Sequence, residues 1–164
     1  MALLEKFLVI RRSLIPNAGK GLFTKVDVPK GTVIVEYKGN LERWNDIKED
    51  DGENSYIFKI NNRWAVDALP LKKNFGRYAN DARGSGRANG LRNNAEYIVK
   101  GLKVYIKSTR KIYAGGEICV DYGREYWQLD RKYAAEKLEA AKAKAKERAK
   151  NNAAKKTVAK KNKR

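Results

Sequence analysis

The sequence has no histidine and a single cysteine, Cys119, among its 164 residues. One cysteine cannot form an internal disulfide, and a structural zinc site needs more thiolate or imidazole ligands than this chain offers. We therefore predict no metal site. Apolar residues alternate around Cys119, so we expect a small buried side chain there. Such cysteine usage fits a reducing, intracellular setting.

Long hydrophobic runs are also missing. No segment approaches the roughly 20 apolar residues that span a bilayer. The first six residues, MALLEK, lack the pattern of a secretory signal. At 164 residues, one domain with room for a tail is expected, and a hydrophobic fraction of 42% is enough for a packed core.

Acidic residues are scarce, and the excess of basic residues is distributed unevenly along the chain. The formal net charge is +18. Residues 131–164 contain 14 Lys or Arg and 3 Asp or Glu, a net +11, so the first 130 residues carry +7. A basic extension of this kind indicates an acidic partner such as nucleic acid, chromatin or a membrane surface. The alternative is a solvated tail that only aids solubility.

Short β-rich runs with frequent glycine dominate the first 128 residues, which favours an irregular, mainly β domain. Two pairs of runs read as hairpins, one around Asn61-Asn62 and one around Lys100-Gly101. The segment 28–31, Val-Pro-Lys-Gly, reads as a turn. The expected strands cover residues 7–10, 32–37, 55–60, 64–67, 96–99 and 103–106.

The character of the chain changes after Gly123. Large apolar residues recur at roughly helical spacing up to Leu138, and beyond it the apolar residues are almost all alanine. Alanine and lysine favour helix, but alanine buries little surface. We predict a domain over 1–128, a helix over 129–150 and a disordered Lys/Ala-rich basic tail over 151–164.

Two glycines flank Lys20 in the segment Gly19-Lys20-Gly21-Leu22. Glycines at this spacing let the backbone approach a ligand closely, although they often form nothing more than a tight turn. The segment is not a phosphate loop, because no Gly-Lys-Ser/Thr follows at the required spacing.

A second polar cluster is Arg77-Tyr78-Ala79-Asn80-Asp81. Without context it is equally consistent with a turn rich in side-chain caps. It is followed, after a Gly/Arg-rich loop over 82–92, by the segment Asn94-Ala95-Glu96-Tyr97.

A third cluster, Gly116-Glu117-Ile118-Cys119-Val120-Asp121-Tyr122, ends in a tyrosine. A lone tyrosine is more often a core or interface aromatic than a catalyst. Taken together and in this order, however, the three clusters resemble the motifs of the SET-domain protein lysine methyltransferases. The resemblance covers about residues 9–127.

The resemblance implies a mainly β SET-domain fold of short curved sheets with a threaded pseudoknot, followed by a C-terminal helix and basic tail. The cysteine-rich zinc segment that follows many SET domains is missing, as in compact viral and bacterial members. The resemblance to these compact members implies that Trp127 and the helix after it close the cofactor-binding side of the domain instead.

The same resemblance implies S-adenosyl-L-methionine as the methyl donor. One departure from the family pattern is Asp81, which stands where histidine is commonest. The residues that the resemblance assigns to cofactor binding are Gly19, Lys20, Gly21, Leu22, Arg77, Tyr78, Asn80, Asp81, Tyr122 and Trp127.

A lysine substrate would account for tyrosines in the active site, because methyl transfer requires an uncharged amine. The attacking amine must be neutral, and since an unperturbed lysine has a pKa of about 10.4, deprotonation near pH 7.4 costs about 4 kcal/mol. An apolar channel and a nearby positive charge lower that cost. We predict Tyr122 as the central catalytic residue, with Tyr37 and Tyr97 lining the channel. By resemblance to mono-methylating members, Tyr97 restricts the product to mono- or dimethyl-lysine.

The predicted function is a protein-lysine N-methyltransferase acting on histone or another nucleic-acid-associated protein, with the basic tail contacting nucleic acid. We expect an intracellular location, either a bacterial cytoplasm or, for a delivered or viral protein, a host nucleus. The alternative is a nucleic-acid-binding or architectural protein with an inactive SET fold. A third hypothesis adds automethylation at lysines such as Lys142, Lys144 and Lys146.

Overall fold

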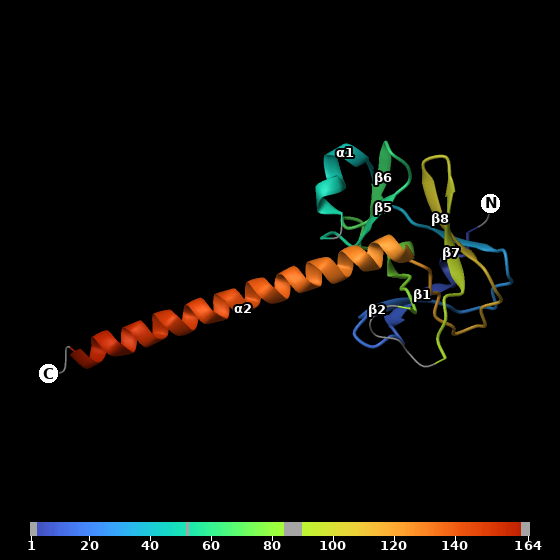
Figure 1. The fold of residues 1–164 in the computed structure, drawn as a ribbon. Helices are drawn as coiled ribbons and strands as arrows, with labels where there is room; N and C mark the ends of the chain where they lie inside the picture. The colour runs from blue at the N-terminus through green and yellow to red at the C-terminus, as the bar shows by residue number, and fades with distance from the viewer. Residues whose placement is uncertain (1–2, 52, 84–89, 162–164) are drawn as a thin grey trace. The chain divides into compact units, whose positions relative to one another are not determined.

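The computed structural model describes residues 3–51, 53–83 and 90–161. The chain divides into two compact units, Met1–Gly123 and Arg124–Arg164. The first unit contains the strands, and the second is helical (Figure 1). Part of the predicted Gly/Arg-rich loop, residues 84–89, lies outside the described residues.

Three small antiparallel sheets form the first unit, as the mainly β prediction required. Each strand has only three to six residues. The sheets pair β1 (Leu8–Arg12) with β2 (Lys20–Thr24), order β3 (Val33–Glu36), β8 (Lys103–Ser108) and β7 (Ala95–Lys100), and order β4 (Asn40–Arg43), β6 (Trp64–Asp67) and β5 (Ile57–Lys59).

Both predicted hairpins are confirmed. In β5–β6 the turn is held by Asn61, whose Oδ1 accepts hydrogen bonds from the backbone N–H of Arg63 at 2.8 Å and of Trp64 at 3.0 Å. In β7–β8, Lys100 pairs with Lys103, and Gly101 has φ = 60°. A positive φ is unfavourable for residues with a Cβ, so glycine suits this turn.

Short helical turns precede or connect these strands in the described part of the first unit. They are η1 (Glu5–Phe7), α1 (Trp44–Ile47), η2 (Lys48–Asp50) and η3 (Gly76–Tyr78). The last of them matters for the site, because it carries the Arg77-Tyr78 pair. Its Gly76 lies so close to the backbone that an added Cβ would be 2.8 Å from the carbonyl oxygen of Glu36.

Alternation along β8 shows how the core is built. Val104, Ile106 and Ser108 point inward and are buried, whereas the residues between them are partly exposed. This two-residue period is what a strand with one buried face requires. Ser108 is satisfied inside, because its hydroxyl donates to the Pro29 carbonyl at 2.6 Å and accepts from the Thr32 N–H at 2.9 Å.

The chain crosses itself around residues 117–122. Asn80 forms a parallel bridge with Cys119, and Ala95 forms one with Val120. The Val120 N–H donates to the Asn80 carbonyl, and the Ala95 N–H donates to the Cys119 carbonyl, both at 2.9 Å. The segment 118–120 therefore runs between two chain stretches that are distant in sequence, as the predicted pseudoknot requires.

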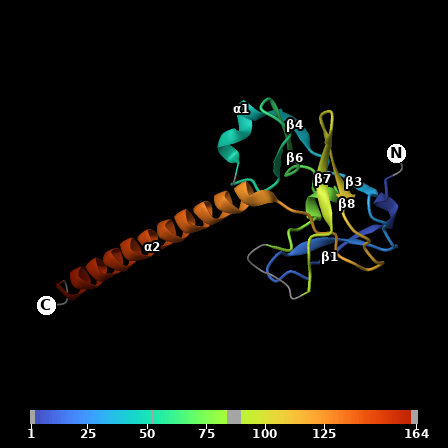
Figure 2. The same cartoon turned by 45° about the vertical axis from the view of Figure 1, so that its right-hand side comes forward.

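Helix α2 (Gly123–Lys161) makes up the second unit (Figure 2). It begins earlier and ends later than the predicted 129–150 helix, because the lysines and alanines beyond 150 continue to favour helix. Helix therefore extends through 151–161 of the stretch predicted to be disordered, and 162–164 lie outside the described residues. Every side chain from 134 to 148 is exposed.

Candidate active site

Asn80 lies at the centre of the chain crossing. Its Nδ2 donates to the Lys20 carbonyl at 3.0 Å and to Oε1 of Glu117 at 3.2 Å. The backbone of the same residue pairs with the 118–120 segment. Two of the three predicted motifs, the Gly-x-Gly segment and the Asn80 cluster, are thus in direct contact, and the third passes beside them.

Glu117 joins these motifs, although the sequence analysis noted it only as part of a pattern. Its side chain is 1% exposed. Oε1 accepts from the Ser13 hydroxyl and Oε2 from the Leu14 N–H, both at 2.7 Å. With Asn80 as a third donor, the buried carboxylate is well paired, which offsets the cost of burying its charge.

The two glycines beside Lys20 have different roles. An added Cβ at Gly21 would lie 2.2 Å from Oε1 of Glu117, so only glycine lets the strand approach the carboxylate. Gly19 has φ = 70°, and an added Cβ there would meet nothing within 4 Å. The main chain at Gly19 therefore borders open space, whereas Gly21 is packed.

Leu22, also predicted to contact the cofactor, is a core residue. Its side chain is fully buried, and its carbonyl accepts from the Ile118 N–H at 2.7 Å. A contact from Leu22 to a ligand would thus use its backbone N–H rather than its side chain. The sequence could not show this, because a leucine beside glycines gives no indication of the direction in which it points.

Tyr122 is held at both ends by one short segment. Its hydroxyl donates to the Ala79 carbonyl at 2.9 Å, and its backbone N–H donates to Oδ2 of Asp81 at 3.0 Å. The ring is partly buried and packs against the main hydrophobic cluster. Asn80 lies between Ala79 and Asp81 in the sequence. The predicted catalytic residue Tyr122 is therefore bonded to the same short segment, 79–81, that contains the predicted cofactor residue Asn80.

Asp81 is 3% exposed, and both its oxygens are engaged. While Oδ2 accepts from Tyr122, Oδ1 accepts from the Arg83 N–H and from Nδ2 of Asn93, each at 2.8 Å. Its carboxylate thus serves the chain crossing. The sequence analysis noted the departure from histidine, but the side chain's partners depend on the tertiary structure.

The rings of Tyr37, Phe58 and Tyr97 form an aromatic cluster. Tyr37 and Tyr97 meet edge to face, with centroids 5.5 Å apart and an interplanar angle of 81°. Phe58, which the sequence analysis did not single out, lies 5.0 Å from Tyr97 and 6.2 Å from Tyr37. Tyr37 is buried, and its hydroxyl donates to the Tyr56 carbonyl at 2.9 Å.

Tyr97 connects this aromatic cluster to the chain crossing, because it packs against two hydrophobic clusters, one that contains Ala79 and Val120 and one that contains Tyr37. One of these clusters also contacts Tyr122. The three predicted channel tyrosines therefore adjoin one continuous apolar region, although they come from positions 37, 97 and 122.

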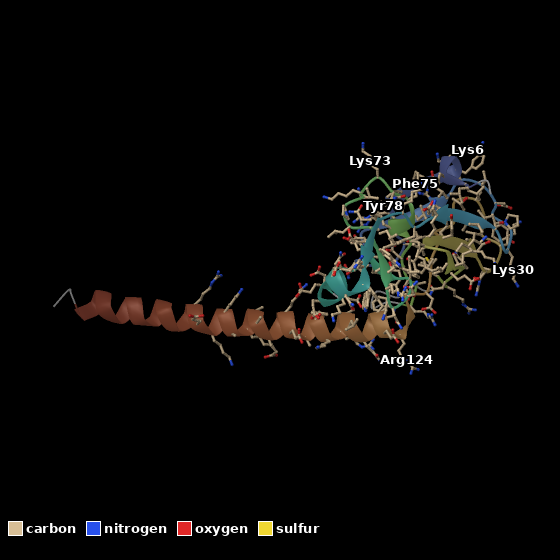
Figure 3. The ribbon with its side chains drawn as sticks, turned by 90° about the horizontal axis from the view of Figure 1, so that it is seen from above. Lys6, Lys30, Lys73, Phe75, Tyr78 and Arg124 are labelled. Carbon is tan, nitrogen blue, oxygen red and sulfur yellow. The ribbon has the colours of Figure 1, made fainter. Side chains whose placement is uncertain are left out.

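Arg77 and Tyr78 contact a different segment. Nη1 of Arg77 donates to the Leu69 carbonyl at 2.8 Å, and its guanidinium lies 3.9 Å from the Tyr56 ring centroid. The Tyr78 hydroxyl donates to the Lys72 carbonyl at 2.9 Å. In Figure 3, Tyr78 is labelled near Phe75, which packs against the same core cluster.

Among the described residues, Nε of Arg77 is a buried nitrogen that lacks a hydrogen-bond partner. Such a group is costly unless an acceptor reaches it. It is a candidate contact for a ligand.

Trp127 belongs to the second unit, where its ring meets that of Tyr126 edge to face at 5.1 Å. The prediction that it closes the cofactor side concerns both units and stays a prediction.

Cys119 is fully buried, as predicted. Burial, together with the nearby carboxylates of Glu117 and Asp81, raises the pKa of its thiol to about 12. A thiol with so high a pKa is almost entirely protonated at neutral pH and is a poor nucleophile. Cys119 therefore contributes packing to the crossing rather than chemistry.

Within residues 3–51, 53–83 and 90–161 there is no group of three or more His, Cys, Asp or Glu side chains that could hold a metal ion. No helix in this part of the chain is long and apolar enough to cross a membrane.

The fold and the crossing define a class of protein, and comparison with known proteins identifies it. Residues 19–123 match the model of the SET domain family. The chain belongs to this family, as the sequence motifs indicated.

Curated relatives carry related names. The chain is 28% identical over 129 residues to "Histone-lysine N-methyltransferase set-1" of Caenorhabditis elegans, which covers 73% of this chain and 51% of the relative. It is 31% identical over 112 residues to the human "Histone-lysine N-methyltransferase 2D", covering 63% of this chain and 2% of the relative. The chain thus spans about half of the first relative and a small part of the second.

A solved structure has a similar fold. It is described as a humanized mutant of the Chaetomium thermophilum Polycomb Repressive Complex 2 bound to the inhibitor GSK126. The match has a TM-score of 0.58 and 22% identity, and it covers 76% of this chain and 16% of that chain. At this identity the likeness concerns the fold.

Proposed function

We propose that this protein is an S-adenosylmethionine-dependent protein-lysine N-methyltransferase. The observation that supports this most directly is the segment Ala79-Asn80-Asp81. It anchors both ends of Tyr122 while the Asn80 amide holds the Gly-x-Gly strand through Lys20. A cofactor strand and a tyrosine hydroxyl are thereby attached to the same three residues, which suits a reaction that depends on alignment.

The residues around the crossing fit the proposed cofactor. The main chain at Gly19 borders open space, and Arg77 offers a cation with a buried, unpartnered Nε for a carboxylate. We assign main-chain contacts to Gly19, Lys20, Gly21 and Leu22 and further contacts to Arg77, Tyr78, Asn80, Asp81, Tyr122 and Trp127. When bound, the cofactor supplies an electrophilic methyl group on a positively charged sulfur.

The protein must present a neutral lysine amine to that methyl group. The rings of Tyr37, Phe58 and Tyr97 form an apolar cluster that disfavours a lysine ammonium and excludes water. The Tyr122 oxygen orients the amine, and its bond to the Ala79 carbonyl restrains it beforehand. In this proposal Tyr122, Tyr97 and Tyr37 are the catalytic residues.

For the substrate, we propose a lysine of a histone or another nucleic-acid-associated protein. The matched relatives are named histone-lysine methyltransferases, and the first 130 residues of this chain are themselves basic. A basic substrate is drawn more readily to a shared nucleic acid than to a basic enzyme. We therefore propose that the reaction takes place on chromatin or its counterpart, in a bacterial cytoplasm or a host nucleus.

We further propose that helix α2 binds nucleic acid. Residues 131–164 carry a net charge of +11, and the side chains from 134 to 148 are exposed. A helix that lies on a membrane needs an apolar face. Between 134 and 148 the one large apolar residue is Leu138, itself 56% exposed. Phosphate contacts are therefore favoured over a lipid surface.

The decisive experiment titrates S-adenosylmethionine by calorimetry and then incubates labelled cofactor with histones and with the protein alone. We expect cofactor binding and labelling of a substrate, with Tyr122→Phe lowering the rate about 100-fold. The control is Tyr113→Phe, since Tyr113 is 68% exposed. Absence of cofactor binding would end the enzyme proposal. Cofactor binding with nucleic-acid binding but no transfer would favour an inactive SET fold, and labelled lysines in the chain itself would indicate automethylation.

A further inference from the structure

Asp81 carries a buried carboxylate whose oxygens are engaged by other parts of the chain, so the cofactor contact proposed for Asp81 falls to its main chain. The residue is 3% exposed and lies one residue after Asn80. Its two oxygens have different partners. Oδ2 accepts from the Tyr122 N–H, and Oδ1 accepts from the Arg83 N–H and from Nδ2 of Asn93. One oxygen thus serves the proposed catalytic tyrosine and the other ties two loop segments together.

We propose that Asp81 is a positioning residue, whose Oδ2 fixes the backbone of Tyr122 so that the phenol reaches its working place. This inference rests on the proposed function of Tyr122. Tyr122 is held at two points. Its hydroxyl donates to the Ala79 carbonyl, and its backbone N–H donates to the Asp81 carboxylate. Without the backbone support, the position of the phenol depends on the remaining contacts of the ring and hydroxyl.

An arginine also approaches this carboxylate. Arg83 approaches Oδ1 with its Nε at 4.0 Å, and its Nη2 also pairs with Asp121, the residue directly before Tyr122. Arg83 is exposed, so both of its pairs are partly screened by water. The neutral donors Tyr122 N–H, Arg83 N–H and Asn93 Nδ2 therefore contribute most of the pairing.

The Asp81→Asn variant breaks one of these bonds selectively. An amide has one oxygen and one NH2 group. Because two donors face the Oδ1 position and one faces Oδ2, the amide oxygen goes to Oδ1 and the NH2 group meets the Tyr122 N–H. The variant therefore keeps the loop bonds and loses the bond to Tyr122.

A matched variant does the reverse. Asn93→Ala removes the Asn93 donor from Oδ1 and leaves Oδ2 with Tyr122. It also removes the Asn93 oxygen that accepts from the Ala82 N–H at 2.8 Å, so a purely structural role predicts a loss of activity at least as large in Asn93→Ala as in Asp81→Asn.

A double variant, Asp81→Asn with Asn93→Asp, reverses the amide. The carboxylate at position 93 attracts the NH2 group of residue 81, which turns the amide oxygen back toward the Tyr122 N–H. The Arg83 N–H, whose bond to Asp81 is part-buried, loses its acceptor in this variant. This double variant should recover what the single Asp81→Asn variant loses.

The test measures kcat, the KM for cofactor and peptide, and amide hydrogen exchange of Tyr122 in the full chain. In Asp81→Asn we expect kcat to fall about tenfold, or about 1.4 kcal/mol. Both KM values should stay within about twofold and exchange of Tyr122 should accelerate. Asn93→Ala should keep kcat near the wild-type value, and the double variant should regain most of it.

Equal losses of kcat in the two single variants, or unchanged exchange at Tyr122, would overturn the inference. If Asp81→Asn does not fold, the double variant decides, since a low kcat in it contradicts the role of the restored bond. Tyr122→Phe is measured in the same series. An inactive wild type, or a fully active Tyr122→Phe, would refute the proposed function itself and not merely the part assigned to Asp81.

Discussion

At the scale of single residues, the site consists of polar groups that are paired before any ligand arrives. The side chains of Asn80, Glu117 and Asp81 share hydrogen bonds with residues 13–14, 20, 83, 93 and 122, and Tyr122 is bonded at both its hydroxyl and its backbone N–H. Such pairing lowers the reorganisation needed during the reaction. It also means that small changes to these side chains should alter catalysis in specific ways.

Tyr97→Phe tests how the aromatic cluster limits the product. The Tyr97 and Tyr37 ring centroids are 5.5 Å apart, and the change to Phe removes a polar hydroxyl from this aromatic cluster, where the proposed amine binds. We expect the product to shift from mono- and dimethyl-lysine toward higher methylation, measured by mass spectrometry of a peptide substrate. Tyr105→Phe is the control, because Tyr105 lies on the opposite face of β8 from Ile106, the partner of Tyr97. An unchanged product distribution would remove Tyr97 from this role.

The high pKa of Cys119 predicts an effect of pH on stability. The thiol pKa is about 12 in the folded protein and about 8.5 in an unfolded chain. Between these values the folded state binds more protons, so stability that is present below pH 8.5 is lost as the pH rises toward 12. The free energy of unfolding of the wild type should therefore fall more steeply above pH 9 than that of Cys119→Ala, by up to about 1.4 kcal/mol per pH unit. Parallel curves from denaturant titrations would contradict it.

At the scale of elements, strand β2 and the segment around Glu117 determine the site because they approach closely. The Glu117 carboxylate stands where a side chain at position 21 would be, and Ser13 and Leu14 hold it from the other side. A displacement of β2 or of the segment around Glu117 would therefore disturb the contact between them. The Gly-x-Gly segment thus has a structural reason for its second glycine in addition to any cofactor contact.

Gly21→Ala should therefore destabilise the protein by about 3 kcal/mol, the upper part of the range for overpacking a tight site. Gly101→Ala is the matched control. Gly101 has φ = 60° and open space around it, so only backbone strain of about 1 kcal/mol is expected. Denaturant unfolding of both variants gives the comparison. A loss at Gly21 no larger than at Gly101 would show that the Glu117 carboxylate moves aside easily.

At the scale of the whole molecule, the positive charge is concentrated in residues 131–164, which carry +11 of the net +18. The first unit contains the chain crossing and the aromatic cluster, and the second is a helix with exposed basic residues and no apolar face between 134 and 148. Electrostatic attraction to phosphates needs no specific docking surface. The proposed nucleic-acid binding should therefore depend strongly on salt.

A triple variant tests this proposal in the full chain. Replacing Lys144, Lys146 and Arg148 with Gln should weaken binding to duplex DNA, and the slope of log K against log salt should become about 2 to 3 units shallower. Fluorescence anisotropy at several salt concentrations measures it. The control replaces three exposed lysines of the first unit, Lys6, Lys30 and Lys100, two of which are labelled in Figure 3. Equal changes in both variants would argue against a special role for α2.

Sequence patterns alone determined much of this protein. Alternating runs, the Asn61 and Gly101 turns and the lysine- and alanine-rich end predicted the hairpins and the long helix, since these depend on neighbouring residues. Three ordered motifs were sufficient to identify the SET family. The length of α2 was underestimated, because propensity without packing gives no clear end to a helix.

Only the tertiary structure decided which side chains serve the site and which serve the core. Leu22 is buried, the carboxylates of Glu117 and Asp81 accept hydrogen bonds from distant segments, and Phe58 joins the tyrosine cluster. These contacts join residues up to 104 positions apart. They are set by the chain crossing, and no local pattern records which distant donor a buried carboxylate will meet.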